Sequence, residues 1–189
     1  VWPNYIKEYY AYGYEKYNDP ALYDYKAGPF QWQHKCVGSY YAWEAGYTGS
    51  GVNVALLDSG VMGTHEDLEG NVKKNVAISD DGFDVTEVSD DAYGHGTPVA
   101  GVIAATAGNK KGGAGIAPEA NIYSYGVGNA YREATVAALM RAVNLAVEDG
   151  AEIVNLSCGS AYYDGNENVV LQNAYQKGVA LFAAAGNQG

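Results

Sequence analysis

The chain has 189 residues, enough for a domain with a sizeable core, and hydrophobic residues make up 48% of it. Its formal net charge of −11 at pH 7 argues against nucleic acid as a partner, because a phosphate-binding surface needs a basic patch. No apolar run is long enough to span a membrane, and the acidic composition suits a soluble protein that is secreted or extracellular.

The amino-terminal part of the chain has no clean hydrophobic period. Because it starts with neither an initiator Met nor a signal-like segment, we expect the chain to begin at a processing site. Aromatic and charged residues over 1–17 indicate an arm lying on the surface of a domain that spans 18–189. Asn18-Asp19-Pro20 predicts a turn, and irregularly spaced apolar residues over 23–37 indicate an extended segment clipped onto the core. A short helix is expected over 38–45.

A regular alternation of strands and helices begins at Val52. Val52–Leu57 is a near-continuous apolar run, as expected of a strand buried on both faces of a parallel sheet. The other expected strands span 72–78, 122–125, 152–156 and 179–184. The expected helices span 95–107, 134–149 and 168–177. This alternation predicts an α/β fold in three layers, a parallel sheet flanked by helices.

Polar residues stand at the carboxyl ends of three expected strands, where the chemistry of such sheets gathers. These residues are Asp58, Ser157 and Asn187, and His95 opens the helix that follows the first of them. Taken singly, each is more often a turn or cap residue. Their shared position at one edge of the sheet indicates a functional site.

The residue types at this edge suit acid–base chemistry. His95 lies between two glycines that leave room around it, and histidine titrates near physiological pH, so it is a candidate general base. A carboxylate from Asp58 on one imidazole nitrogen would fix the tautomer and stabilise the imidazolium. The amide of Asn187 could donate a hydrogen bond to a developing oxyanion.

Six segments in order resemble the motifs of subtilisin-like serine proteases, the subtilase family. The segments are VALLDSGV at 54–61, HEDL at 65–68, HGTPVAG at 95–101, GIAP at 115–118, IVNLS at 153–157 and AAGN at 184–187. Weaker likeness extends to Asn18, so the resemblance covers about residues 18–189. The order of aspartate before histidine also fits this family among the serine hydrolases.

The resemblance implies a serine endopeptidase that hydrolyses polypeptide substrates and requires no cofactor for the chemistry. It makes Asp58 the residue that orients the base, His95 the general base and acid, and Asn187 the side-chain donor of the oxyanion hole. It also implies that the substrate backbone pairs, as an added strand, with two edges of the protein. One edge is Ser157, Cys158 and Gly159, and the other is Gly126, Val127 and Gly128, continuing to Ala130.

Three features depart from the family pattern. Pro98 stands where many members have a second, non-catalytic histidine, and Cys158 stands where leucine is usual. Cys158 and Cys36 are the only cysteines, and they either pair or both stay free. The nucleophilic serine is expected in a Gly-Thr-Ser motif after Asn187, but the chain stops at Gly189. We therefore expect this chain to be inactive alone and a complementary C-terminal chain of the same precursor, or a downstream segment, to carry the serine.

The resemblance also implies a structural calcium site. Asp67 and Asn109 occupy the positions from which many subtilases bind the ion, and oxygen ligands of this kind suit Ca²⁺. Lys110 and Lys111 lie in the same loop and oppose a cation, so a solvated loop is the alternative.

A different class of function stays open beside the protease. A non-catalytic subtilase-like module would bind peptides or a partner protein and would never have had the serine. A nucleotide-binding doubly wound domain is disfavoured, because the strand ends lack a glycine-rich phosphate-binding fingerprint joined to a helix.

Overall fold

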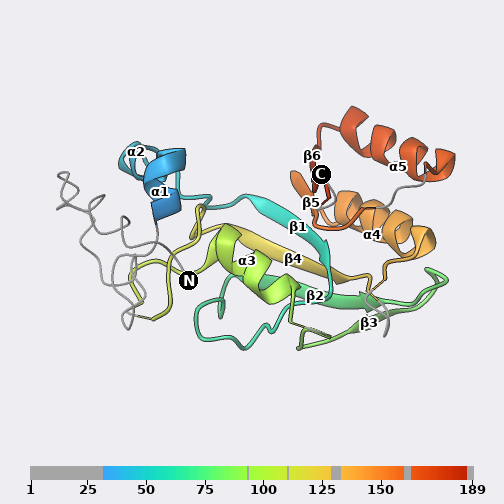
Figure 1. The fold of residues 1–189 in the computed structure, drawn as a ribbon, viewed down its shortest axis with the longest axis horizontal. Coiled ribbons are helices and arrows are strands. Elements are labelled where there is room, and N and C mark those ends of the chain that lie inside the picture. The colour runs from blue at the N-terminus through green and yellow to red at the C-terminus, as the bar shows by residue number, and fades with distance from the viewer. Residues whose placement is uncertain (1–31, 93, 110, 129–132, 160–162, 187–189) are drawn as a thin grey trace.

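The structure is a computed structural model that describes residues 32–92, 94–109, 111–128, 133–159 and 163–186 (Figure 1). The arm expected over 1–17, the turn at Asn18-Asp19-Pro20 and the oxyanion candidate Asn187 lie outside these residues. The helices are α1 (Trp32–Val37), α2 (Ser39–Glu44), α3 (Gly96–Ala104), α4 (Val136–Glu148) and α5 (Gly165–Gln176). The strands are β1 (Asn53–Asp58), β2 (Val72–Ile78), β3 (Val85–Glu87), β4 (Asn121–Gly126), β5 (Ile153–Leu156) and β6 (Ala180–Ala183).

Within the described residues, one sheet of six strands runs in the order β3-β2-β4-β1-β5-β6. All neighbouring strands pair in parallel except β2 and β3, which are antiparallel. The expected α/β fold is thus confirmed, and β1 lies near the centre between β4 and β5. The sequence gives no signal for β3, because its three residues are all exposed and contribute backbone pairing at an edge rather than burial.

Each face of β1 buries its own core, which explains the unbroken apolar run. Ala55 and Leu57 belong to a cluster with Tyr125 of β4 and with apolar residues of α4 and α5. Val54 and Leu56 belong to a second cluster on the opposite face, with Ala100 and Ala104 of α3. Helix α3 therefore covers one face of the sheet, and α4 and α5 cover the other (Figure 1). The three-layer arrangement is confirmed.

Local capping decides where the helices begin and end. In α5, Asp164 accepts hydrogen bonds from the amides of Asn166 and Glu167, so the helix starts at Gly165, earlier than the expected 168. Helix α3 ends at Ala104 because the backbone of Ala105 turns to an extended conformation, with φ −59° and ψ 135°. No helix of the described residues is both long enough and apolar enough to cross a membrane.

The extended segment expected over 23–37 is wrong for its last six residues, which form α1. This helix is too short, at six residues, to show a hydrophobic period; its His34 side chain is buried, while Cys36 and Val37 are exposed. The imidazole of His34 contacts the carbonyl oxygen of Ala114 at 3.0 Å, which fastens α1 to the loop after α3. Helix α2 forms within the expected 38–45, and its Trp43 ring contacts the His34 ring at a tilt of 55°, with the ring centroids 5.1 Å apart.

Candidate active site

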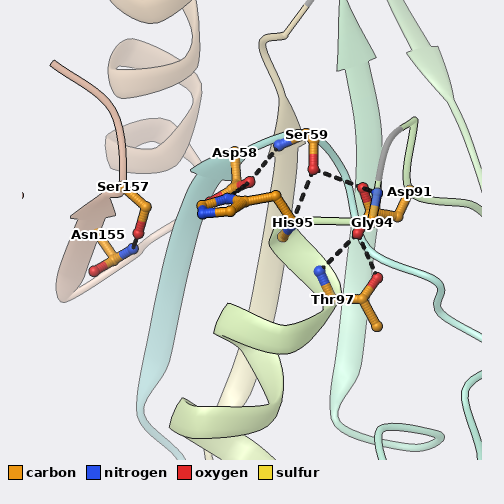
Figure 2. A network of polar contacts seen from close by, with 9 residues as sticks. Asp58, Ser59, Asp91, Gly94, His95, Thr97, Asn155 and Ser157 are labelled. Atoms are coloured by element: carbon orange, nitrogen blue, oxygen red, sulfur yellow. Dashed lines mark hydrogen bonds and ion pairs between the residues drawn. The ribbon is translucent and has the colours of Figure 1, made fainter. Parts of the chain in front are cut away.

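The end of β1 and the start of α3 bring Asp58 and His95 into direct contact. Asp58 is the last residue of β1 and His95 is the N-cap of α3. The imidazole Nδ1 lies 2.7 Å from the carboxylate Oδ1 of Asp58 (Figure 2). Because a carboxylate accepts hydrogen bonds, Nδ1 carries the proton and Nε2 is left as the basic nitrogen. The carboxylate is 4% exposed and the imidazole 58% exposed, so a buried anion orients an accessible base.

The Asp58 carboxylate concentrates its contacts on one oxygen. Oδ1 accepts the hydrogen bond of His95 and a second one from the amide of Ser59, at 2.7 Å. Oδ2 is buried and has no hydrogen-bond partner among the described residues. Among the described residues, the contacts with His95 and with the Ser59 amide are therefore the ones that compensate for burying this carboxylate.

The glycine after His95 lets α3 begin directly against β1. A Cβ on Gly96 would collide with the carbonyl oxygen of Gly60 and lie 3.1 Å from the Cβ of Asp58. Gly60 itself has φ +102°, a conformation that residues with side chains rarely adopt. Gly96 and Gly60 therefore allow α3 to lie close to the end of β1, and this close contact sets the separation of Asp58 and His95.

The sequence pattern did not predict the polar network that lies behind Asp58 and His95. The Asp91 carboxylate accepts hydrogen bonds from the Gly94 amide (2.9 Å), the Thr97 amide (2.8 Å), the Thr97 hydroxyl (2.7 Å) and the Ser59 hydroxyl (2.6 Å) (Figure 2). The Ser59 hydroxyl in turn accepts from the Gly96 amide at 2.9 Å. Burial raises the pKa of Asp91, but these hydrogen bonds outweigh it and hold the pKa below its usual range. The available signal was an aspartate shortly before a helix start.

The two candidate substrate edges lie on either side of Asp58. On the β4 side, Gly126 is in register with Asp58, and the Val127 amide donates to the Asp58 carbonyl at 2.8 Å. Gly128 forms an isolated antiparallel bridge with Ala134. On the β5 side, the Ser157 hydroxyl accepts a 2.8 Å hydrogen bond from the side-chain NH₂ group of Asn155. The strand order β4-β1-β5 thus places both edges beside the carboxylate.

Cys158 and Gly159 continue the β5 edge beyond Ser157. Gly159 is exposed, whereas Cys158 is half-buried and packs against the core cluster under α4. Burial, with added repulsion from the Asp58 and Glu167 charges, raises the pKa of the Cys158 thiol to about 11. Both Cys36 and Cys158 are free thiols in the structure, which settles the question that the sequence left open.

The candidate calcium residues meet at a buried carboxylate. Asp67 is buried, and its two oxygens accept hydrogen bonds from the Asn109 side chain (2.7 Å) and the Gly113 amide (3.0 Å). A Cβ on Gly112 would collide with the same carboxylate, so the loop wraps it closely. The described residues contain no group of three or more His, Cys, Asp or Glu placed for a metal. Binding of Ca²⁺ would require the Asn109 side chain to turn its oxygen, which accepts from the Lys111 amide at 2.9 Å, toward Asp67.

Comparison with known protein sequences identifies the family of this chain. The sequence profile of the subtilase family matches residues 49–189. The chain belongs to the subtilase family. This subtilase chain is 33% identical over 172 residues to the thermophilic serine proteinase of Bacillus sp. (strain AK1), covering 91% of this chain and 41% of the relative.

Two further relatives show the same partial coverage. Thermitase from Thermoactinomyces vulgaris is 33% identical over 172 residues, which is 91% of this subtilase chain and 58% of thermitase. Subtilisin Savinase from Lederbergia lenta is 38% identical over 144 residues, which is 76% of this chain and 51% of Savinase. The chain therefore spans between 41% and 58% of the length of these three relatives.

Proposed function

We propose that the protein is a serine endopeptidase of the subtilisin type, with its nucleophilic serine supplied by a downstream segment or a second chain. The observation that carries this proposal is the 2.7 Å contact between the exposed imidazole of His95 and the buried carboxylate of Asp58. Membership of the subtilase family supports it, as does the similarity to a relative named a thermophilic serine proteinase. Substrates are polypeptides.

In the proposed reaction, Nε2 of His95 takes the proton of the serine hydroxyl as its oxygen attacks the carbonyl carbon of the peptide bond. Asp58 keeps the proton on Nδ1 and stabilises the imidazolium that forms. The side-chain amide of Asn187 donates a hydrogen bond to the oxyanion of the tetrahedral intermediate. The imidazolium then gives its proton to the leaving amine, and water hydrolyses the acyl-enzyme by the same steps.

The substrate backbone is proposed to lie between the two edges that flank Asp58. Residues Gly126 to Gly128 would pair with it on one side and Ser157 to Gly159 on the other, as added strands do. Main-chain pairing gives affinity without reading the substrate sequence, so this arrangement of two edges suits an enzyme that cleaves extended segments of many proteins.

Secretion and calcium binding complete the proposal. Two relatives from Bacillus subtilis (strain 168), 35% and 33% identical, are named minor extracellular proteases, which supports an extracellular location here. Calcium would be held by Asp67 and Asn109 and would fasten the loop after α3. The ammonium of Lys111 lies 3.3 Å from the Glu66 carboxylate, so part of the opposing charge is neutralised. The ion would take no part in the reaction.

The decisive experiment compares residues 1–189 with the longest chain that the gene encodes. The longer form should hydrolyse a peptide and be labelled by a fluorophosphonate, whereas residues 1–189 alone should do neither. His95→Ala should lower kcat by more than about a thousandfold, a size known from subtilisin itself. Asn187→Ala should lower kcat by a smaller factor and leave KM nearly unchanged, because its donor acts in the transition state.

Two results would reject the protease. Near-normal kcat in His95→Ala would remove the proposed base. If the longest encoded chain showed no hydrolysis and no labelling, the protein would be a peptide-binding or partner-binding module of the same fold.

A further inference from the structure

Helix α3 begins without using the side chain of its own N-cap residue. The first amides of a helix have no partner within it and need outside acceptors. The Gly96 amide is satisfied by the Ser59 hydroxyl at 2.9 Å and the Thr97 amide by the Asp91 carboxylate at 2.8 Å. The third residue, Pro98, has no N–H to satisfy. His95 makes no side-chain capping hydrogen bond, so its imidazole is available to Asp58.

The Asp91 carboxylate contacts the neighbours of both members of the pair. Oδ1 accepts from the hydroxyl of Ser59, the residue after Asp58, and from the amide of Gly94, the residue before His95. The backbone also connects this segment to the end of β1. Asp91 forms an isolated antiparallel β-bridge with Gly60, and the Ala92 amide donates to the Ser59 carbonyl at 3.1 Å. One side chain therefore links the end of β1 to the start of α3.

The charge state of Asp91 strengthens this link. Although burial disfavours the anion, hydrogen bonds from Ser59, Thr97 and Gly94 hold the pKa below its usual range, so the carboxylate is ionised at neutral pH. Hydrogen bonds to an ionised acceptor are about twice as strong as those between neutral groups. The link is thus made of four charge-assisted contacts rather than four ordinary ones.

We propose that Asp91 is a positioning residue that holds His95 and Asp58 at hydrogen-bond distance by anchoring the backbone beside each of them. The consequence for catalysis rests on the proposed peptidase function, whereas the consequence for the imidazole does not. A purely structural role predicts something different: loss of Asp91 would lower stability and leave the His95–Asp58 contact as it is.

The test uses Asp91→Ala, Asp91→Asn and the matched control Asp90→Ala in the longest chain that the gene encodes. Asp90 is exposed, and its carboxylate accepts from the Asp91 amide, so its loss changes the net charge equally without touching α3. Asp91→Asn keeps the shape but turns one acceptor into a donor, which keeps a folded variant in the series if Asp91→Ala unfolds. Proton NMR follows the Nδ1–H resonance of His95 without substrate, and peptide hydrolysis gives kcat and KM.

We expect the Nδ1–H resonance to move upfield or broaden in Asp91→Ala, less so in Asp91→Asn, and to stay unchanged in Asp90→Ala. Turnover should fall about 10- to 100-fold in Asp91→Ala with KM changed less than about twofold, the size expected for misplacing a catalytic group by about 1 Å. Asp90→Ala should stay within about twofold of wild type.

Several outcomes would overturn the proposal. An unchanged Nδ1–H resonance in folded Asp91 variants would overturn the proposal whatever their activity. An equal effect of Asp90→Ala would also overturn it, because the change in net charge would then explain the shift. In an active wild type, a lost resonance with unchanged kcat would also reject it. If the wild type hydrolyses nothing but the resonance still depends on Asp91, the positioning role stands and the peptidase function fails.

Discussion

Gly96 of α3 packs against the backbone of Gly60 so closely that a single added carbon would overlap the carbonyl oxygen of Gly60. The contact joins the first residue of a helix to the turn that follows the central strand. It stands beside the pair of Asp58 and His95 and sets how near they come. A change at Gly96 should therefore affect both stability and geometry.

We expect Gly96→Ala to lower the free energy of unfolding by about 1–3 kcal/mol, because the backbone must shift to admit the methyl group. Gly101→Ala is the matched control, since Gly101 lies in the same helix and a Cβ there meets nothing within 4 Å. That control should raise stability by about 0.5–1 kcal/mol through helix propensity. Urea unfolding of both variants measures these free energies. Equal values for Gly96→Ala and Gly101→Ala would show that the backbone admits the methyl group at Gly96 without cost.

Calcium should stabilise the wild-type protein through Asp67. A ligand at one hundred times its Kd adds about 2.7 kcal/mol to the free energy of unfolding, so the melting temperature should rise with Ca²⁺ and fall with a chelator. Asp67→Asn should abolish this response. Glu69→Gln, which removes another exposed carboxylate of the same segment, should keep it. A melting temperature independent of Ca²⁺ in the wild type would leave the loop held by its hydrogen bonds alone.

Acid should weaken the attachment of α1 through His34. Burial lowers the pKa of His34, and the hydrogen bond to the Ala114 carbonyl opposes this only in part. With the folded pKa below the unfolded one, the contribution to stability is present above about pH 6.5 and is lost as pH falls. His34→Gln should flatten the dependence of unfolding free energy on pH over that window, and His65→Gln, at an exposed histidine, should not. Parallel pH profiles for wild type and His34→Gln would contradict this.

Alkylation should distinguish the two cysteines. The exposed Cys36 should react with iodoacetamide well before Cys158, whose pKa of about 11 keeps it a neutral thiol at pH 7 to 8. The rate at Cys158 should rise about tenfold for each pH unit until the pH approaches that pKa. Mass spectrometry of peptides after timed quenching measures both rates, with Cys36→Ser to isolate Cys158. Comparable rates at pH 7.5 would place Cys158 on an open surface.

The hydrophobic pattern of the sequence predicted the sheet and the pair of Asp58 and His95, but not the features that depend on a few individual contacts. The buried run before Asp58 and the glycines around His95 were enough to expect both residues at one edge of a parallel sheet. Asp91 left little signal, because two of its four hydrogen-bond donors are backbone amides, which carry no sequence information. The other two are common hydroxyl groups, of Ser59 and Thr97. Helix α1 was missed because six residues are too few to show a period, and strand β3 because its three residues are all exposed. The role of Asn187 stays a prediction, since it lies outside the described residues.

The position of β1 has a consequence for the order in which the molecule assembles. Its neighbours are β4, in register from Asn121, and β5, in register from Ile153, so both partners are synthesised long after β1 itself. Pairings between distant parts of a chain close large loops and form slowly. During synthesis on the ribosome, β1 therefore remains unpaired until β4 and β5 have been made. Asp58 and His95 can take their final geometry only once most of the described chain has emerged.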